Sequence, residues 1–237
     1  MLARNPSGGA VLDYYHDVGV SWIGEFKNTM KLELKDKQVL VLGLGDTGLS
    51  ALRWLHRQGA CLSVADTRET PPGVATLQAE LPSVKLHTGA FAEAVFKNAE
   101  LIVISPGVPM AEPMVQAAIR RGLPVVGDVE LFAQYKPASA KIIAITGANG
   151  KSTVTTLVGE MCKSAGLQTV VAGNIGVPVL DTLDGDVPDV YVLELSSFQL
   201  ETTSSLNADA ATVLNISEDH MDRYDSFADY AAAKNRI

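Results

Sequence analysis

The sequence is poor in the residues that most often build metal or disulfide sites. Its 237 residues include only two cysteines, Cys61 and Cys162, and four histidines. Both cysteines lie among apolar residues and neither has the spacing of a metal ligand, so we expect buried thiols in a reducing compartment.

Long apolar runs and basic runs are also missing. No segment approaches the length of a membrane span, and the N-terminus lacks the apolar core of a signal peptide. The chain has 19 basic and 27 acidic side chains, a net charge of −8, which argues against an extended nucleic-acid surface. We therefore expect a cytoplasmic protein without membrane insertion or a nucleic-acid partner.

What the chain does have is a hydrophobic content of 47%, with strands and helices in alternation from Gln38 onwards. The run Val39–Leu42 is continuously apolar, as expected of a parallel strand buried on both faces. Further strands are expected at 61–65, 84–87, 101–105 and 125–126, with helices around 49–56, 74–80, 113–121 and 128–134. This alternation predicts an α/β fold with a Rossmann-like parallel sheet over residues 31–136.

The segment 136–140 resembles a linker, and a second α/β unit is expected over 137–237. Its predicted strands are 142–145, 169–172, 190–193 and 211–215. A helical pattern runs from Phe227 to the last residue, so we expect a truncated central domain. Residues 1–30 differ from the rest and are interpreted as an extension of unknown role.

The stretch Thr146–Thr153 is the most informative motif. It follows an apolar strand and leads into a helical segment, so the predicted order is strand, glycine-rich turn, helix. Such a turn directs backbone N–H groups and a helix N-terminus at phosphate oxygens. Lys151 would reach the terminal phosphates and the Ser152 hydroxyl would contact Mg²⁺. Only two residues separate Gly147 from Gly150, where the general P-loop pattern has four, and an ordinary turn before a helix is the alternative. The predicted ATP-binding residues are Gly147, Ala148, Asn149, Gly150, Lys151, Ser152 and Thr153.

A second glycine motif, Gly43-x-Gly45-x-x-Gly48, follows the first strand, and Asp66 ends the next one. This arrangement is typical of a nucleotide diphosphate site, for a nicotinamide dinucleotide or a UDP-sugar. Thr67, Arg68 and the turn Ser105–Gly107 would lie at the same edge of the sheet. The alternative is that the glycines only allow close packing of helix and strand.

Polar residues also follow strands of the second unit. Glu194 lies in an apolar strand and is a plausible Mg²⁺ ligand, or else a paired structural residue. His220 lies in an acidic cluster after a strand, and spacing alone leaves its role open. Lys234 taken alone would be a solvated helix lysine.

These motifs together resemble the Mur ligases, the ATP-dependent amino-acid-adding enzymes of peptidoglycan synthesis. The resemblance rests on 146–153, 174–176, 193–200 and 215–224, and the first domain is most similar to the D-glutamate-adding members. It covers about Gln38 to Ile237. Family members carry a third, C-terminal domain, which we expect to be absent here.

The resemblance implies roles for individual residues. Asp46, Thr47, Asp66, Thr67, Arg68 and Gly107 would bind the uridine nucleotide, with Ser197 and Gln199 lining the substrate site. Ser152, Glu194, His220 and a carbamylated Lys234 would hold two Mg²⁺ ions. Lys151, Asn174, His220 and Lys234 would be catalytic. Position 46 often carries an apolar residue in the family, so the resemblance does not say how Asp46 would contact the nucleotide.

The implied reaction joins D-glutamate to UDP-N-acetylmuramoyl-L-alanine at the expense of ATP, by a monomeric enzyme. We expect the 237 residues alone to hold a uridine nucleotide but not to ligate. Another Mur-type ligase, a folate polyglutamate ligase, an NAD-dependent dehydrogenase and a nucleotide-binding module without enzymatic activity are the alternatives.

Overall fold

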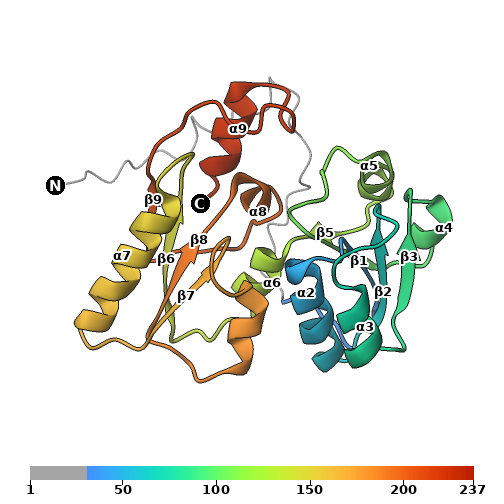
Figure 1. Ribbon diagram of the computed structural model, residues 1–237, viewed down its shortest axis with the longest axis horizontal. Helices are drawn as coiled ribbons and strands as arrows, with labels where there is room; N and C mark the ends of the chain where they lie inside the picture. Colours follow the sequence, from blue (N-terminus) through green and yellow to red (C-terminus); the bar gives the residue numbers. More distant parts are fainter. Residues whose placement is uncertain (1–30) are drawn as a thin grey trace. The chain divides into compact units, whose positions relative to one another are not determined.

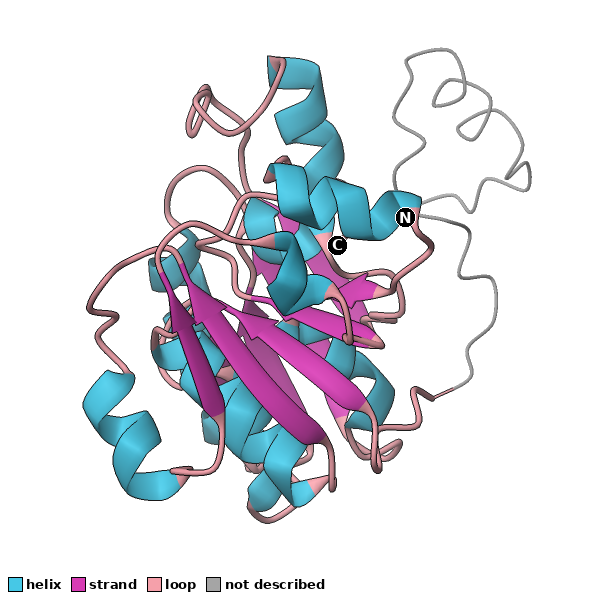
Figure 2. Ribbon diagram, turned by 90° about the vertical axis from the view of Figure 1, so that its right-hand side faces the viewer, coloured by secondary structure: helices cyan, strands magenta, loops and turns pink. Residues whose placement is uncertain are grey.

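The computed structural model describes residues 31–237, so the predicted extension over residues 1–30 lies outside the described residues. The described part contains two parallel sheets, one of five and one of four strands (Figure 1). Helices lie on both sides of the strands (Figure 2). The predicted α/β class is confirmed.

The first sheet has the strand order β3-β2-β1-β4-β5, with every pairing parallel. Its strands are β1 (Gln38–Leu42), β2 (Cys61–Asp66), β3 (Lys85–Thr88), β4 (Leu101–Ile104) and β5 (Val125–Val126). Its helices are α2 (Asp46–Arg57), α3 (Val74–Glu80), α4 (Glu93–Phe96), α5 (Pro113–Arg120) and α6 (Asp128–Tyr135). The strand order reverses between β1 and β4, and open α/β sheets hold ligands outside the carboxyl ends of strands at such a point.

The second sheet has the order β7-β8-β6-β9 and is also parallel. Its strands are β6 (Lys141–Thr146), β7 (Thr169–Gly173), β8 (Val190–Glu194) and β9 (Ala210–Val213). The helices are α7 (Lys151–Ser164), the 3-10 helix η1 (Val179–Asp184), α8 (Ser197–Glu201) and α9 (Phe227–Lys234). Because β6 lies between β8 and β9, the loop after β6 is flanked by the ends of both neighbours.

Alternate residues of the central strands β1, β4, β6 and β8 enter different cores, which explains their apolar runs. Val39 and Val41 face one core, whereas Leu40 and Leu42 face another with Phe96. The first of these cores also takes in one face of the second sheet, through residues that include Ile142, Ala144, Tyr191 and Leu193. The two sheets therefore share a hydrophobic core.

Helix α6 forms part of this shared core. The Phe132 ring meets the Tyr191 ring of β8 edge-on, with centroids 4.9 Å apart, and Tyr135 meets Trp54 of α2 at 4.7 Å. The Glu130 carboxylate accepts hydrogen bonds from the backbone N–H groups of Ser204 (2.6 Å) and Ser205 (2.9 Å), beyond α8. Helix α6, the last helix of the first α/β unit, is thus bonded to the second unit, although the segment 136–140 that follows it has the composition of a linker.

One prediction about side-chain burial is wrong. Cys61, expected to be a buried thiol, is exposed, and Cys162 is partly buried. Cys61 is the first residue of β2, and the burial pattern of that strand passes from exposed at this end to buried at its carboxyl end.

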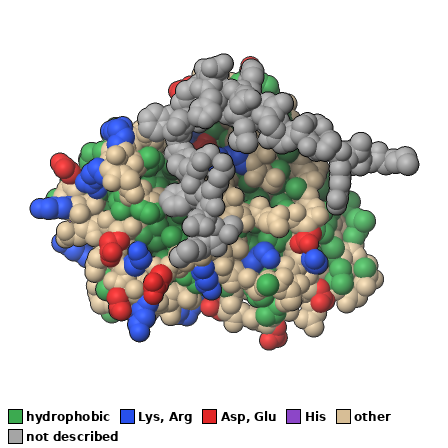
Figure 3. All heavy atoms as spheres, turned by 180° about the vertical axis from the view of Figure 1, so that it is seen from behind, with side chains coloured by type: hydrophobic (Ala, Val, Ile, Leu, Met, Phe, Trp, Pro, Cys, Tyr) green, Lys and Arg blue, Asp and Glu red, His purple; other side chains and the backbone are tan. Residues whose placement is uncertain are grey.

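The surface of the described residues carries both signs of charge. On the face shown in Figure 3, acidic and basic side chains are interspersed over the part that is coloured by type. Within residues 31–237 no helix is both long enough and apolar enough to cross a membrane.

A prediction concerns Gly48, in the first turn of α2. A Cβ atom placed there would lie 1.9 Å from the Gly43 carbonyl oxygen, so the helix could not keep its distance from β1. We expect Gly48→Ala to lower the free energy of unfolding by at least about 2 kcal/mol, measured by urea denaturation. Gly45→Ala is the matched control, because a Cβ there meets nothing within 4 Å. A Gly48→Ala protein as stable as the unmodified chain would contradict the packing described here.

Candidate nucleotide-binding active site

The glycine-rich turn follows the central strand β6, and helix α7 starts at Lys151. Gly150 is the N-cap residue of α7 and has a left-handed backbone (φ 81°), which suits glycine, and a Cβ there would enter open space. The N–H groups of the first helical turn have no partner within a helix, so this end can receive an anion. Ser152 and Thr153, which follow in that turn, are exposed.

The Lys151 ammonium currently folds back on its own turn. Its Nζ donates a hydrogen bond to the Ala148 carbonyl oxygen at 3.0 Å. The side chain is partly exposed, so it can exchange this contact for a phosphate oxygen without opening the core.

Glu194 is the last residue of β8 and pairs in register with Ile145 of β6. It is 1% exposed; one carboxylate oxygen, Oε1, accepts a hydrogen bond from Asn174 Nδ2 at 2.7 Å. The other oxygen, Oε2, is buried and has no hydrogen-bond partner among the described residues. An unsatisfied buried carboxylate oxygen is costly, and a cation beside it would remove that cost. One predicted ligand of the Mg²⁺ site, Glu194, therefore has a carboxylate oxygen available to a cation, and the hydrogen bond from Asn174 fixes the orientation of that carboxylate.

Lys234 is not the solvated lysine that its helix suggests when taken alone. It is 2% exposed, and its Nζ donates to the Gly147 carbonyl oxygen at 2.9 Å, which ties α9 to the turn after β6. Burial lowers the pKa of Lys234 to about 8; the charge of Lys151 also lowers it, and Asp219 opposes the shift. A lowered pKa raises the share of the uncharged amine at neutral pH, and this is the form that can react with carbon dioxide.

His220 is exposed and has a left-handed backbone (φ 54°), uncommon for a residue other than glycine. Its ring lies 4.8 Å from the Phe198 ring, and its Nε2 lies 3.5 Å from an Asp219 carboxylate oxygen. Over residues 31–237 no group of three or more His, Cys, Asp and Glu side chains is arranged to hold a metal. The role of His220 as a metal ligand stays a prediction.

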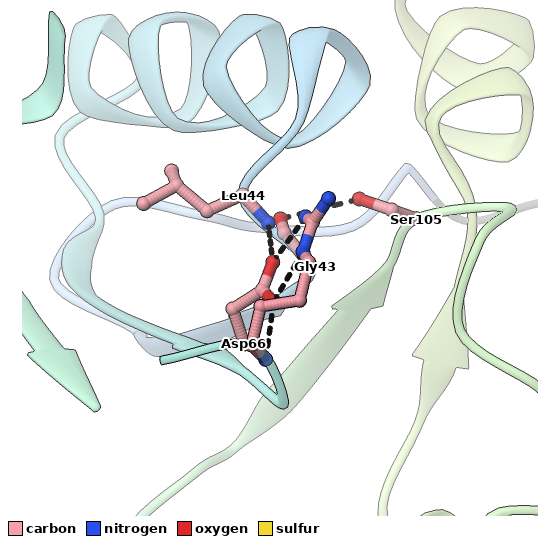
Figure 4. A network of polar contacts seen from close by, with 5 residues as sticks. Gly43, Leu44, Asp66 and Ser105 are labelled. Atoms are coloured by element: carbon pink, nitrogen blue, oxygen red, sulfur yellow. Dashed lines mark hydrogen bonds and ion pairs between the residues drawn. The ribbon is translucent and has the colours of Figure 1, made fainter. Parts of the chain in front are cut away.

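At the first sheet, Asp66 forms the centre of the network drawn in Figure 4. One of its oxygens accepts the Leu44 N–H at 2.7 Å, and both accept hydrogen bonds from the Arg68 guanidinium at 2.6 and 2.8 Å. Burial raises the pKa of Asp66, but the hydrogen bonds from Arg68 and Leu44 outweigh it and hold the pKa at about 2. Asp66 thus shapes the loop after β1 as well as ending β2.

The three glycines of this loop have different tasks. Gly43 and Gly48 allow the close approach of β1, α2 and Ser105, and Gly43 has a left-handed backbone (φ 91°). A Cβ at Gly45 would meet nothing within 4 Å. Close packing, the alternative considered above, therefore accounts for two of the glycines, and Gly45 leaves room for a ligand.

The other predicted contacts for the uridine nucleotide lie at the carboxyl edge of this sheet. Asp46 and Thr47 begin α2, Thr67 follows β2, and Gly107 lies in the turn after β4.

Ser197 and Gln199, the residues predicted to line the substrate site, are buried. Gln199 accepts from the Ser196 N–H and donates to Asp128, at 3.1 and 3.4 Å. Direct contact of either side chain with a substrate stays a prediction.

Two residues of the 215–224 motif, to which the sequence assigned no individual role, connect the parts of the site. Arg223, after β9, donates to the Pro106 carbonyl oxygen at 3.3 Å, beside the predicted uridine-nucleotide residue Gly107. Asn215 makes hydrogen bonds to the turn after β6. The motif did not predict these contacts, because both side chains bond to backbone atoms of segments distant in the chain.

The fold and the candidate site define an α/β protein with two parallel sheets and a glycine-rich loop after a strand of each, β1 and β6. The family description "Mur ligase MurD-like, N-terminal domain" matches residues 37–127, and "Mur ligase middle domain" matches residues 145–237. The chain belongs to the Mur ligase family.

Curated relatives agree with this assignment. The chain is 74% identical over 206 residues to UDP-N-acetylmuramoylalanine–D-glutamate ligase of Methylobacillus flagellatus, an alignment covering 87% of this chain and 45% of the relative. The enzyme of that name from Thiobacillus denitrificans is 56% identical over 225 residues, with 87% and 48% covered. The chain spans about half the length of the curated relatives it matches.

A solved structure shares the fold. The UDP-N-acetylmuramate:L-alanyl-gamma-D-glutamyl-meso-diaminopimelate ligase from Neisseria meningitides has a TM-score of 0.53 at 19% identity, covering 84% of this chain and 67% of that one. The family matches span both sheets, whereas the dehydrogenase alternative explains only the first glycine loop and the folate ligase alternative only the second unit.

The low pKa of Asp66 predicts how stability changes with pH. Its folded pKa, about 2, lies below the ordinary 3.8, so its contribution is fully present above about pH 5 and is lost as the pH falls towards 2. We expect Asp66→Asn to cost about 2 kcal/mol of unfolding free energy at pH 7 and progressively less below pH 4.

Urea denaturation from pH 2.5 to pH 7 [~, P197] measures this difference. Asp186→Asn, at an exposed position, is the control for the general effect of removing a carboxylate. A cost for Asp66→Asn that does not vary with pH would show that the Arg68 pair does not stabilise the fold.

Proposed function

We propose that this chain is the nucleotide-binding part of an ATP-dependent ligase that adds D-glutamate to UDP-N-acetylmuramoyl-L-alanine. The substrates follow from the names of the curated relatives. The observation that carries the chemistry is the buried Glu194 carboxylate, with one unsatisfied oxygen, on the strand next to the Lys151 turn. The enzyme would work in the cytoplasm, in peptidoglycan precursor synthesis, as a monomer.

The reaction needs ATP because a carboxylate is a poor electrophile at neutral pH. In the proposed sequence the L-alanine carboxylate attacks the γ-phosphorus of ATP, and ADP leaves with the electron pair of the broken P–O bond. The D-glutamate amine then attacks the acyl phosphate carbonyl carbon, and phosphate leaves the tetrahedral intermediate. The amide is formed and the amine loses a proton.

The residues of this chain contribute position and charge. The N-terminus of α7 and Lys151 would bind the ATP phosphates and stabilise the charge that builds up during phosphoryl transfer. Ser152, Glu194, His220 and a carbamylated Lys234 are the proposed ligands of two Mg²⁺ ions, which would neutralise the anions brought together at the site. Asn174 would hold Glu194 in its orientation through the hydrogen bond described above.

The first sheet would bind the uridine nucleotide through Asp46, Thr47, Asp66, Thr67, Arg68 and Gly107. The open space at Gly45 and Gly107 supports this proposal, because a ligand can approach the backbone there. Residues beyond this chain would complete the D-glutamate and ATP sites, so ligation is expected only when they are supplied.

The ligase proposal predicts the effect of removing the loop lysine. A chimera that carries this chain and the remaining half of the 74% identical relative should lose at least about 100-fold in kcat/KM when Lys151 becomes Ala, because a preorganised cation at the transferred phosphate is lost. The measurement is phosphate release dependent on D-glutamate. Lys163→Ala, an exposed position near the other end of α7, should change the rate by less than about 2-fold. Equal activity of the Lys151→Ala and Lys163→Ala enzymes would refute the assignment.

The isolated chain tests the ligand of the first sheet. We expect UDP to bind and to raise its melting temperature, and NADH to leave it unchanged, because the names of the curated relatives contain a UDP-linked substrate. Calorimetric titration with both ligands gives the affinities. Binding of NADH alone would favour the dehydrogenase alternative, and detectable D-glutamate ligation by the 237 residues would contradict the expected need for further sequence.

A further inference from the structure

Asn215 lies two residues beyond the end of β9, directly beside the glycine-rich turn. Strand β9 pairs with β6 in parallel, with Val213 opposite Thr146, and the Leu214 N–H donates to the Thr146 carbonyl oxygen at 2.9 Å. The chain after β9 therefore runs alongside the turn that α7 follows.

The Asn215 side chain bonds to both backbone hydrogen-bonding groups of one residue in that turn. Its Oδ1 accepts the Asn149 N–H at 2.9 Å, and its Nδ2 donates to the Asn149 carbonyl oxygen at 2.9 Å. The Asn215 carbonyl oxygen also accepts the Ala148 N–H at 3.0 Å. Three hydrogen bonds from one residue thus hold two consecutive residues of the turn.

These bonds decide which donors the turn can offer to a ligand. The N–H groups of Ala148 and Asn149 are used within the protein, so the donors left for an anion lie at the start of α7. Gly147 and Gly150 flank the held pair, and a segment between glycines has many conformations to lose when it is ordered. The Lys234–Gly147 hydrogen bond restrains the turn at its other end.

We propose that Asn215 is a positioning residue that preorganises residues 148 and 149 for ATP binding. It does not touch the phosphates; it lowers the cost of ordering the turn when they arrive. The inference rests on the proposed function, since it assigns the ligand of this turn as ATP.

The main test compares Asn215→Ala with the control Asn207→Ala in the chimera described above, because residues beyond this chain would complete the ATP site; Asn207 is exposed and precedes the other end of β9. Loss of two side-chain hydrogen bonds should weaken ATP binding roughly 10- to 100-fold, while UDP binding at the first sheet stays unchanged. Asn207→Ala should leave both affinities unchanged. Unaltered ATP affinity in Asn215→Ala overturns the proposal, and so does an equal loss of ATP and UDP binding, which would mark a general loss of fold.

Asn215→Asp separates positioning from packing because it keeps the size of the side chain. The ionised carboxylate can accept the Asn149 N–H but faces the Asn149 carbonyl oxygen without a proton to donate. Its ATP affinity, relative to that of the unmodified chimera at the same pH, should therefore be weak from about pH 8 to about pH 6 and recover only towards about pH 4, near the ordinary pKa of an Asp side chain, where the carboxyl group takes up a proton. A ratio that does not change with pH contradicts the donor role of Nδ2.

Amide hydrogen exchange, measured without nucleotide, tests the role of Asn215 separately from the proposed binding of ATP. In the unmodified chain the amides of Ala148 and Asn149 should be protected, and Asn215→Ala should remove the protection of Asn149, whose N–H bonds to the lost side chain. Failure of the unmodified chimera to bind ATP would refute the proposed function, whereas equal protection of the Asn149 amide in both proteins would refute the role of Asn215 alone.

Discussion

The site depends on the position of β6 in the middle of the second sheet. Its parallel pairing with β8 and β9 brings three strand ends to one edge, and with them the Lys151 turn, Glu194 and Asn215. Neighbouring parallel strands end at the same edge of a sheet. Residues that are more than 40 positions apart in sequence are therefore brought into contact by strand pairing alone. The Thr146 hydroxyl strengthens this edge by donating to the Leu195 carbonyl oxygen at 2.6 Å.

Two cations lie close to the turn and have different environments. Lys151 is partly exposed and bonds to its own turn, whereas Lys234 is buried against the Gly147 carbonyl. The repulsion between them is one of the reasons why the pKa of Lys234 falls. A ligand that brings negative charge would relieve this repulsion, so the turn is electrostatically prepared for phosphate before any arrives.

The first and second sheets are coupled through packing as well as through hydrogen bonds. Helix α6 places Phe132 against Tyr191, and Glu130 accepts backbone N–H groups that follow α8. Arg223 reaches the carbonyl oxygens of the turn that contains Gly107. A shared core and these polar contacts would hold a uridine nucleotide and ATP in a fixed relation, which is what transfer between two bound substrates requires.

The sequence by itself determined the order and type of the main elements, because the central strands β1, β4 and β8 are buried on two faces and form apolar runs. It also located both glycine loops, whose spacing is a local property. The short elements α4, η1 and α8 were not predicted, since four to six residues are too few to show a period. Only the tertiary structure decided that Lys234 is buried, that Cys61 is exposed, that Asp66 is paired with Arg68 and that Asn215 holds the turn. Burial and hydrogen-bond partners depend on which distant segments pack together, and the Lys234–Gly147 contact, between residues 87 positions apart, has no local pattern that could predict it.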